Sequence, residues 1–268
     1  MDPIFLHNYH SHTKRCGHAE GEDEEYVLAA IANGFKTIGF SDHVILPGVD
    51  QKRMRGSYDQ LEDYIASVLS LKAKYKDQID VKLAFECEYF HDSFSDYYRE
   101  LLSERGFEYL ILGQHCCYDR MFNAMIFYGD IVSRRQRLEQ YTKDLLDGMR
   151  SGLFLYVAHP DLFLLFYRQW DEHAENAARK ICQTAEQLRI PLELNMGRTR
   201  RSHRVELWDE SAMIYPYPKF WEIVSQYNID VVVGVDAHSP KDYFDSDYAA
   251  FAEILKKMNL KSRQKLPV

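Results

Sequence analysis

The sequence predicts an α/β fold in which a parallel sheet is covered by helices. Apolar runs of strand length alternate with longer stretches of helical periodicity, in seven successive strand-then-helix units. The strands are almost continuously apolar, which is typical of parallel sheets that are buried on both faces. Seven successive units favour a closed barrel with its active site at the C-terminal ends of the strands. An open, doubly wound sheet is the alternative architecture.

The predicted strands are short apolar runs that end at polar residues. No Gly-x-Gly-x-x-Gly follows the first of them, so the sequence does not support a dinucleotide site there. Because no low-complexity linker or tandem repeat interrupts the units, residues 1–268 are predicted to form a single barrel domain. The predicted strands are residues 4–9, 36–41, 81–85, 109–112, 154–158, 191–194 and 229–235.

The predicted helices place apolar residues at helical spacing, as Leu61, Ile65 and Val68 do in the second of them. The first helix begins with acidic residues and stops before Asn33-Gly34, a dipeptide that commonly ends helices. The predicted helices are residues 23–32, 58–75, 95–105, 131–149, 171–188, 218–227 and 242–258.

Composition narrows the classes of function. The chain has 33 basic and 41 acidic residues, and its net charge of −8 argues against general nucleic-acid binding. No apolar run approaches the ~20 residues of a membrane span, and no signal-peptide pattern begins the chain. The five cysteines are irregularly spaced and include no Cys-x-x-Cys, so we expect reduced thiols in a cytoplasmic protein.

Three histidines near the start of the chain suggest a metal site. His10 and His12 are two residues apart, so an extended backbone points both imidazoles to one face. Residues 13–17 have the composition of a loop that could return His18 to the same point. Neutral imidazole is the commonest metal ligand in proteins. The alternative is a polar turn with scattered histidines.

Metal-binding residue types recur just after the predicted strands. Six of the seven strands are followed by such residues, and the sixth strand offers Asn195 instead. Each could be ordinary alone, as a helix cap, a solvated charge or a turn, but in a barrel these positions converge on one mouth. Together they predict a multi-metal site with N and O ligands, which suits zinc, manganese or iron. The predicted ligands are His10, His12, His18, His43, Glu86, His115, His159, Asp236 and His238, with Asp42 beside them.

The charge of such a site predicts an anionic substrate. Three divalent ions would exceed the two negative charges of Glu86 and Asp236, so the mouth would attract a phosphate ester. Clustered metals generate a hydroxide nucleophile at neutral pH, which makes phosphoester hydrolysis the expected reaction. Arginines after the fifth and sixth strands are candidates for phosphate binding, with a solvated basic loop as the alternative. These candidates are Arg168, Arg198, Arg200 and Arg201, with Arg53 and Arg55 as further ones.

The same residues resemble the motifs of the polymerase and histidinol phosphatase (PHP) family along essentially the whole chain. They are His10-Ser11-His12 with His18, Ser41-Asp42-His43, Glu86, His115, His159 and Asp236-Ala237-His238. Further segments resemble the monofunctional histidinol-phosphate phosphatase branch of this family. They are residues 39–43, 86–90, 112–115, 158–161 and 192–195.

The resemblance implies a distorted (β/α)7 barrel with three divalent metal ions and a hydroxide bridging two of them as the nucleophile. It implies catalytic roles for Glu86 as a bridging ligand and for Asp42 in handling a proton or supporting a ligand. The branch hydrolyses L-histidinol phosphate to L-histidinol and phosphate in histidine biosynthesis. The implied ligand groups are His10, His12, Glu86 and Asp236; Glu86, His115 and His159; and His18, His43 and His238.

One departure from the family pattern concerns metal affinity. Asn8 occupies a position where the family usually has Asp, and an amide adds no negative charge. Two other functions stay open: another phosphoesterase of this family, such as a nucleotide phosphatase or nuclease, and a non-enzymatic metal-dependent binding module. The sequence does not indicate an oligomeric state.

Overall fold

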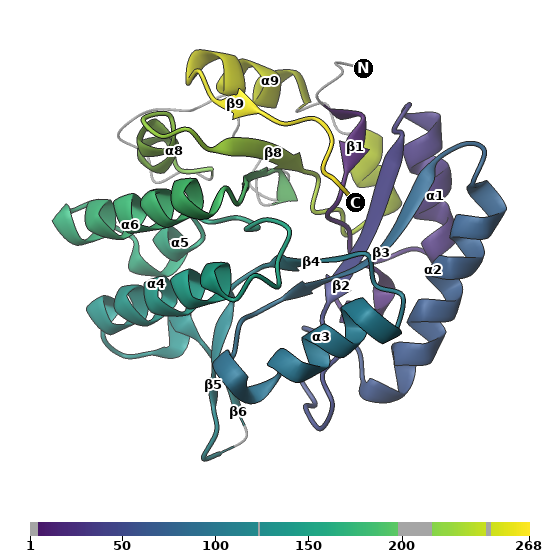
Figure 1. The fold of residues 1–268 in the computed structure, drawn as a ribbon, viewed down its shortest axis with the longest axis horizontal. Coiled ribbons are helices and arrows are strands. Elements are labelled where there is room, and N and C mark those ends of the chain that lie inside the picture. The colour runs from purple at the N-terminus through teal and green to yellow at the C-terminus, as the bar shows by residue number, and fades with distance from the viewer. Residues whose placement is uncertain (1–4, 123, 198–215, 245–247) are drawn as a thin grey trace.

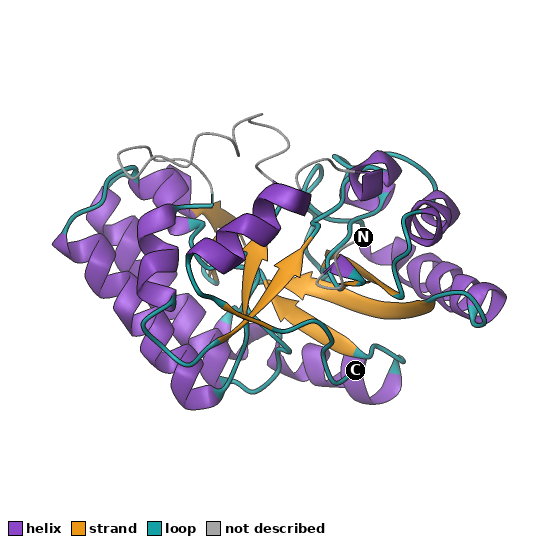
Figure 2. Ribbon diagram, turned by 90° about the horizontal axis from the view of Figure 1, so that it is seen from above, coloured by secondary structure: helices purple, strands orange, loops and turns teal. Residues whose placement is uncertain are grey.

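Parallel strands in the centre of the molecule are surrounded by helices (Figures 1 and 2). The computed structural model describes residues 5–122, 124–197, 216–244 and 248–268. Two groups of parallel strands follow the chain in order. The first comprises β1 (His7–Asn8), β2 (Thr37–His43), β3 (Asp80–Cys87) and β4 (Tyr109–Leu112); the second comprises β7 (Leu192–Asn195), β8 (Asp230–Gly234) and β9 (Lys261–Ser262).

Isolated bridges close these two groups into a ring. Val157 pairs with Leu112 at the end of β4 and with Leu192 in β7, while Ser11 pairs with Ala237, beyond β8. The backbone N–H of His12 donates to the carbonyl of Ala237 at 2.8 Å. In the described residues, β1 to β4, the segment at Val157, β7 and β8 therefore occupy seven parallel positions, which confirms the predicted barrel. The barrel is distorted, because residues 154–158 make only this single bridge on each side instead of the predicted strand.

The helices confirm most of the predicted ranges. The first one matches its prediction. Within the predicted helix 242–258, a 3₁₀ helix ends at Phe244 and an α-helix begins at Tyr248, and residues 245–247 lie outside the described residues. The α-helices are α1 (Asp23–Ala32), α2 (Leu61–Tyr75), α3 (Ser95–Glu104), α4 (Arg134–Arg150), α5 (Phe163–Tyr167), α6 (Glu172–Leu188), α8 (Pro218–Val224) and α9 (Tyr248–Lys257). The 3₁₀ helices are η2 (Lys14–Cys16), η3 (Tyr58–Gln60), η4 (His91–Ser93), η5 (Tyr128–Asp130) and η7 (Pro240–Phe244). Within the described segments, no helix has the length and apolar character that crossing a membrane requires.

An antiparallel hairpin, which the sequence analysis did not predict, begins directly after His115. Its strands are β5 (Cys116–Asp119) and β6 (Ala124–Phe127), and it projects away from the barrel (Figure 1). The strands are only partly buried and the intervening sequence contains no Asn-Gly or Asp-Gly, so both the apolar pattern and the turn signal are weak.

A small apolar cluster lies inside the barrel, apart from the large core between strands and helices. It contains Tyr9, Ala84 and Ala158, which each precede a predicted metal ligand by one or two residues. Leu266 near the C-terminus joins this cluster and donates its backbone N–H to the Tyr9 hydroxyl at 3.0 Å. The barrel interior is therefore filled behind the ligands, and the polar side chains gather at its C-terminal mouth.

Candidate metal centre

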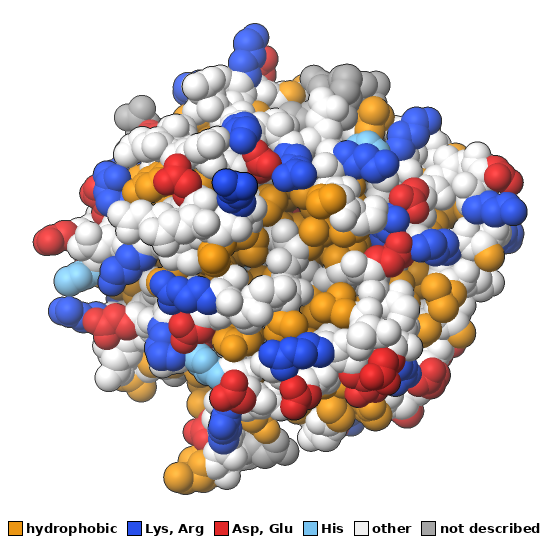
Figure 3. Space-filling view, in the orientation of Figure 1, with side chains coloured by type: hydrophobic (Ala, Val, Ile, Leu, Met, Phe, Trp, Pro, Cys, Tyr) orange, Lys and Arg blue, Asp and Glu red, His pale blue; other side chains and the backbone are white. Residues whose placement is uncertain are grey.

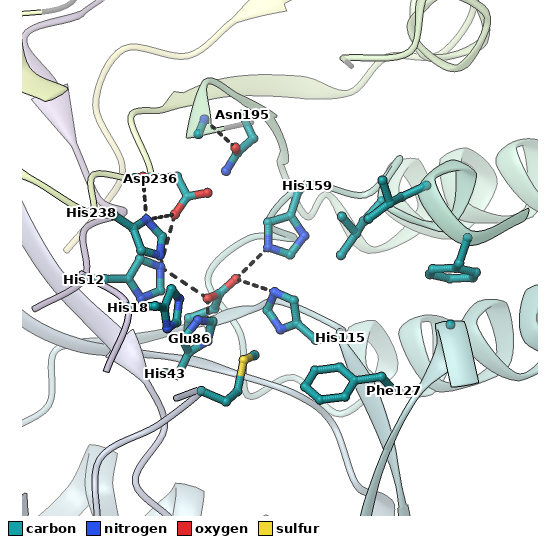
Figure 4. A pocket seen from close by; sticks show the side chains of 16 residues that line it. His12, His18, His43, Glu86, His115, Phe127, His159, Asn195, Asp236 and His238 are labelled. Atoms are coloured by element: carbon teal, nitrogen blue, oxygen red, sulfur yellow. Dashed lines mark hydrogen bonds and ion pairs between the residues drawn. The ribbon is translucent and has the colours of Figure 1, made fainter. Parts of the chain in front are cut away.

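The residues that follow the strand ends share one cavity of about 330 Å³ (Figure 4). Its polar side is formed by most of the histidines and carboxylates expected from the sequence, and its other side is apolar. The polar lining residues are His12, His18, His43, Glu86, His115, His159, Asn195, Asp236 and His238; the remainder are Met54, Phe127, Gly129, Leu162, Leu165, Phe166 and Gly197.

Glu86, at the end of β3, lies at the centre of the ligand set. Its Oε1 is 2.7 Å from His159 Nε2 and 3.6 Å from both His115 Nε2 and His10 Nε2. Its Oε2 faces the other way, 3.0 Å from His43 Nδ1 and 3.5 Å from His12 Nε2. The two oxygens therefore face different histidines, as a carboxylate that bridges two metal ions would.

Asp236, which follows β8, completes the first group of ligands. Asp236 Oδ1 lies 3.1 Å from His12 Nε2 and 3.5 Å from His10 Nε2. His10, His12 and Glu86 each offer a ligand atom within 4.8 Å of the others. This group agrees with the first expected set, and strands β1, β3 and β8 supply it.

His18, His43 and His238, the third expected set, form a further group within the same 4.8 Å limit, and their binding of a metal ion stays a prediction. His43 also belongs to a group with Glu86 and His115, which the sequence analysis did not foresee. Cys16 groups with His12 and His238, but burial raises the pKa of its thiol to about 12 and so disfavours the thiolate that binds metals.

Unpaired buried atoms indicate that this donor set fits divalent cations. Among the described residues, His12 Nδ1, His43 Nδ1 and Glu86 Oε2 are buried and make no hydrogen bond of good geometry, although His43 Nδ1 and Glu86 Oε2 lie 3.0 Å apart. Buried polar atoms without partners are costly, and a bound cation would satisfy the lone pairs. The N and O donors suit zinc, manganese or iron.

Electrostatics support the same assignment. Burial raises the pKa of Glu86, but the surrounding histidines outweigh burial and hold this pKa well below its usual range. Burial lowers the pKa of His238 to about 3, which leaves the neutral imidazole that binds metals. Burial also lowers the pKa of His12, but Asp236 and Asp42 outweigh it and raise this pKa to about 9. A metal ion at His12 would therefore displace a proton.

Two outer carboxylates orient the ligands, and sequence reasoning gave neither of them a role. Glu193 Oε1 accepts from His10 Nδ1 at 2.8 Å, and Glu88 Oε1 accepts from His115 Nδ1 at 3.1 Å. Each contact leaves the Nε2 atom of the histidine to face the centre. Both carboxylates are buried; Glu193 lies within the apolar strand β7 and Glu88 directly follows β3, and an acidic residue in or beside an apolar run was the available signal.

A comparison with known families gives a match over residues 8–197, described as a PHP domain. The chain belongs to the PHP family. The match covers most of the barrel, and the ligands Asp236 and His238 follow it in the chain. That residues 1–268 form a single domain stays a prediction.

Three curated relatives of this PHP protein are named as histidinol-phosphatases or probable histidinol-phosphatases. A probable histidinol-phosphatase from Deinococcus radiodurans is 28% identical over 86% of this chain and 85% of the relative. A histidinol-phosphatase from Bacillus subtilis is 24% identical over 91% of this chain and 97% of the relative. A probable histidinol-phosphatase from Schizosaccharomyces pombe is 27% identical over 86% and 80%.

Solved structures support the fold. One of a putative histidinol phosphatase from Listeria monocytogenes has a TM-score of 0.68 at 19% identity, covering 91% of this chain and 99% of its own. One of histidinol phosphate phosphatase from Lactococcus lactis, complexed with zinc, L-histidinol and phosphate, has a TM-score of 0.69 at 18% identity, covering 96% and 95%.

Asp42 of the PHP barrel lies behind the ligands and does not line the cavity. Its Oδ2 accepts from the Thr13 backbone N–H at 3.2 Å and from the Thr13 hydroxyl, and its Oδ1 is 3.6 Å from His12 Nδ1. Of the two roles considered for Asp42, this geometry supports orientation of a ligand over proton transfer to a substrate.

The candidate phosphate-binding arginines are not among the cavity residues that the structure describes. Arg168 is exposed after α5, donates its Nε–H to the Leu165 carbonyl at 3.2 Å and does not line the cavity. Arg55 is buried against Glu88. That Arg168 contacts phosphate stays a prediction, as it does for three arginines outside the described residues, Arg198, Arg200 and Arg201.

Asn8, in β1, joins this strand of the PHP barrel to the chain just beyond β8. Its Oδ1 accepts from the backbone N–H of Val235 at 2.9 Å and of His10 at 3.2 Å. Its Nδ2 donates to the Tyr243 hydroxyl at 2.8 Å and to the His10 carbonyl at 3.0 Å. The amide therefore both donates and accepts where His10 and Asp236 are positioned, which a carboxylate alone cannot do.

Proposed function

We propose that this PHP protein hydrolyses L-histidinol phosphate to L-histidinol and phosphate, a reaction of histidine biosynthesis. The observation that carries the proposal is the arrangement of histidines around both oxygens of Glu86, at a cavity with one apolar side. The choice of substrate is supported by the names of the curated relatives and by the ligands of the Lactococcus lactis structure.

Three divalent ions would be held by the ligand groups described above. Such ions lower the pKa of a water molecule to near neutrality and stabilise charge that develops on a phosphoryl group. Zinc is the metal named for the Lactococcus lactis structure, and manganese or iron would suit the same ligands. Glu193 and Glu88 hold His10 and His115 through Nδ1, so these rings keep their orientation when the substrate binds.

The two sides of the cavity match the two halves of the proposed substrate. The phosphate would lie at the histidines and carboxylates, where the metal charge exceeds that of Glu86 and Asp236. The imidazole and its carbon chain would lie toward the apolar side, which includes Phe127 in Figure 4 together with Leu165 and Phe166. An apolar wall also limits the access of water to the reacting group.

A small phosphate ester fits this protein better than nucleic acid. The net charge is −8, and on the face drawn in Figure 3 basic and acidic side chains are intermingled without a continuous basic area. A cytoplasmic location stays a prediction, and so does the alternative activity on nucleotides.

The decisive experiment is steady-state hydrolysis of L-histidinol phosphate by protein of measured metal content. A panel of simple phosphomonoesters, nucleotides and short nucleic acids runs beside it, and chelator-treated protein serves as the control. We expect kcat/KM to be at least ~100-fold higher for L-histidinol phosphate than for the panel. We expect chelation to abolish the activity and returned metal to restore it. Equal activity across the panel at full metal content would favour another PHP phosphoesterase.

A further inference from the structure

We propose that Arg55 is a positioning residue that links one wall of the substrate cavity to the metal ligand His115, through Glu88. The link joins segments that follow three neighbouring strands. Arg55 lies in the loop between β2 and η3, Glu88 directly follows β3, and His115 follows β4. Arg55 does not line the cavity and contacts no ligand atom that faces the centre, so this role goes beyond the proposed function.

The guanidinium of Arg55 is held on all sides. Its Nη2 donates to Glu88 Oε1 at 3.1 Å and to Oε2 at 3.0 Å, in an ion pair whose two side chains are both fully buried. Its Nη1 donates to the Val44 carbonyl at 2.9 Å, and its Nε donates to Gln51 Oε1 at 2.8 Å. A planar group with donors in three directions suits this place, because the three acceptors come from different parts of the chain.

Arg55 also closes the turn that places Met54 in the cavity wall. The backbone N–H groups of Met54 and Arg55 both donate to the Gln51 carbonyl, at 3.1 Å and 3.2 Å. The described structure has no helix or strand between β2 and η3, so the loop depends on this backbone turn and on the side-chain contacts of Arg55 with Gln51 and Val44. Met54 lines the cavity beside the histidines. The position of Met54 therefore depends on the contacts of its neighbour.

Glu88 carries the link onward to the metal centre. Its Oε1 accepts from both Arg55 Nη2 and His115 Nδ1, and His115 Nε2 then lies 3.6 Å from Glu86 Oε1. The corresponding carboxylate on the other side, Glu193, accepts from Asn195 Nδ2, the Tyr156 hydroxyl and the His159 backbone N–H, with no arginine partner among the described residues. Removal of Arg55 leaves a buried carboxylate without its cation, and such a carboxylate attracts other donors and moves.

The test compares Arg55→Leu with Lys52→Leu, which removes an exposed cation from the same loop. Two readouts do not depend on activity: metal retention against a competing chelator, and the ¹³C-methyl NMR signal of Met54 in metal-loaded protein. For Arg55→Leu we expect at least one ion to be lost about tenfold more readily and the Met54 signal to shift. For Lys52→Leu we expect both to match the parent. Parent-like retention and an unmoved Met54 signal in Arg55→Leu would overturn the proposal.

A double variant covers the case in which Arg55→Leu does not fold. Arg55→Leu with Glu88→Gln removes both charges, and the Gln carbonyl can still accept from His115 Nδ1. We expect this variant to fold, to retain metal within about threefold of the parent, and to show a displaced Met54 signal with a raised KM and a nearly unchanged kcat. An unmoved Met54 signal in the double variant would refute the link. If the parent itself does not hydrolyse L-histidinol phosphate, the proposed function fails, while metal retention and the Met54 signal still decide the role of Arg55.

Discussion

Gly113 lies directly against the carboxylate of Glu86, so that a Cβ built on Gly113 would overlap Oε1, the oxygen that faces His159. The same relationship recurs twice: a Cβ on Gly197 would overlap Asp236, and one on Gly234 would overlap Glu193. The backbone just after β4 and β7 and at the last residue of β8 thus closes on three carboxylates of the centre. Each carboxylate therefore occupies space that a side chain at the neighbouring glycine would need.

We predict that Gly113→Ala weakens metal binding while the barrel stays folded. The new methyl group must displace the Glu86 carboxylate, which is the ligand shared by two groups of histidines. We expect at least a ~10-fold loss of metal affinity, measured by competition with a chelator, and far-UV circular dichroism like that of the parent. Gly129→Ala is the control, because a Cβ at Gly129 meets nothing within 4 Å. Equal retention in both variants would contradict the prediction.

A change at Glu193 tests whether the outer carboxylates support metal binding by orienting the ligands. Its Oε2 accepts from the His159 backbone N–H at 3.1 Å and from Asn195 Nδ2 at 2.8 Å, while Oε1 accepts from His10 Nδ1. In Glu193→Gln an NH2 group replaces one of the two oxygens and meets hydrogen-bond donors that it cannot accept from. We therefore expect metal affinity to fall ~10- to 100-fold. Glu172→Gln, on the exposed face of α6, should leave it unchanged. A parent-like metal titration for Glu193→Gln would show that His10 does not need this partner.

Strand ends carried most of what the sequence could predict about the centre. Parallel strands align their carboxyl ends, so ligands that follow β1, β3, β4 and β8 meet without any knowledge of long-range contacts. The i, i+2 spacing of His10 and His12 predicted a common face, because side chains two residues apart in an extended chain point the same way. Segment 154–158 was predicted as a strand from its apolar run, but in the structure only Val157 forms bridges, one to each neighbouring strand.

Partners across strands could not be predicted. Nothing in the sequence near Glu88 shows that Arg55 will neutralise it, because the two residues meet only when the loop after β2 folds over β3. Arg55 therefore looked like one of several phosphate-binding candidates. Glu193 stands out in the sequence as a charged residue within an apolar strand. Its partner, His10, is 183 residues away in the chain and could not be predicted from local pattern. Such contacts follow from the closed ring and not from local pattern.

The apolar side of the cavity should determine preference for the organic half of the substrate. Phe166 lines the cavity and stacks on Tyr128, with ring centroids 5.6 Å apart. We expect Phe166→Ala to raise KM for L-histidinol phosphate ~10-fold with little change in kcat, because it removes contact area that ground state and transition state share. Phe122→Ala, at a ring that is 75% exposed, is the control. If activity on the smallest phosphomonoester falls equally, Phe166 acts on the fold and not on the substrate.

Asp161 is a buried carboxyl that the metal centre does not use directly. Its Oδ2 accepts from the Tyr217 backbone N–H at 2.9 Å and from Trp221 Nε1 at 3.2 Å, which anchors the start of α8. Its Oδ1 is buried and has no hydrogen-bond partner among the described residues. Burial accordingly raises the pKa of Asp161 from 3.8 to about 6. The folded protein therefore binds a proton here at a pH where the unfolded chain has released it.

This raised pKa predicts the direction of a pH effect on stability. Protonated Asp161 contributes stability that is fully present below pH 3.8 and is lost as the pH rises through about 6. Between pH 4.5 and 7.5, the free energy of unfolding of the metal-free parent should fall by about 2 kcal/mol relative to that of Asp161→Asn, which cannot ionise. Urea titrations of both proteins across this range measure the difference, and every other titrating group is common to the two. Parallel curves would mean that Asp161 keeps an ordinary pKa, and that the donors from Tyr217 and Trp221 are enough to stabilise its charge.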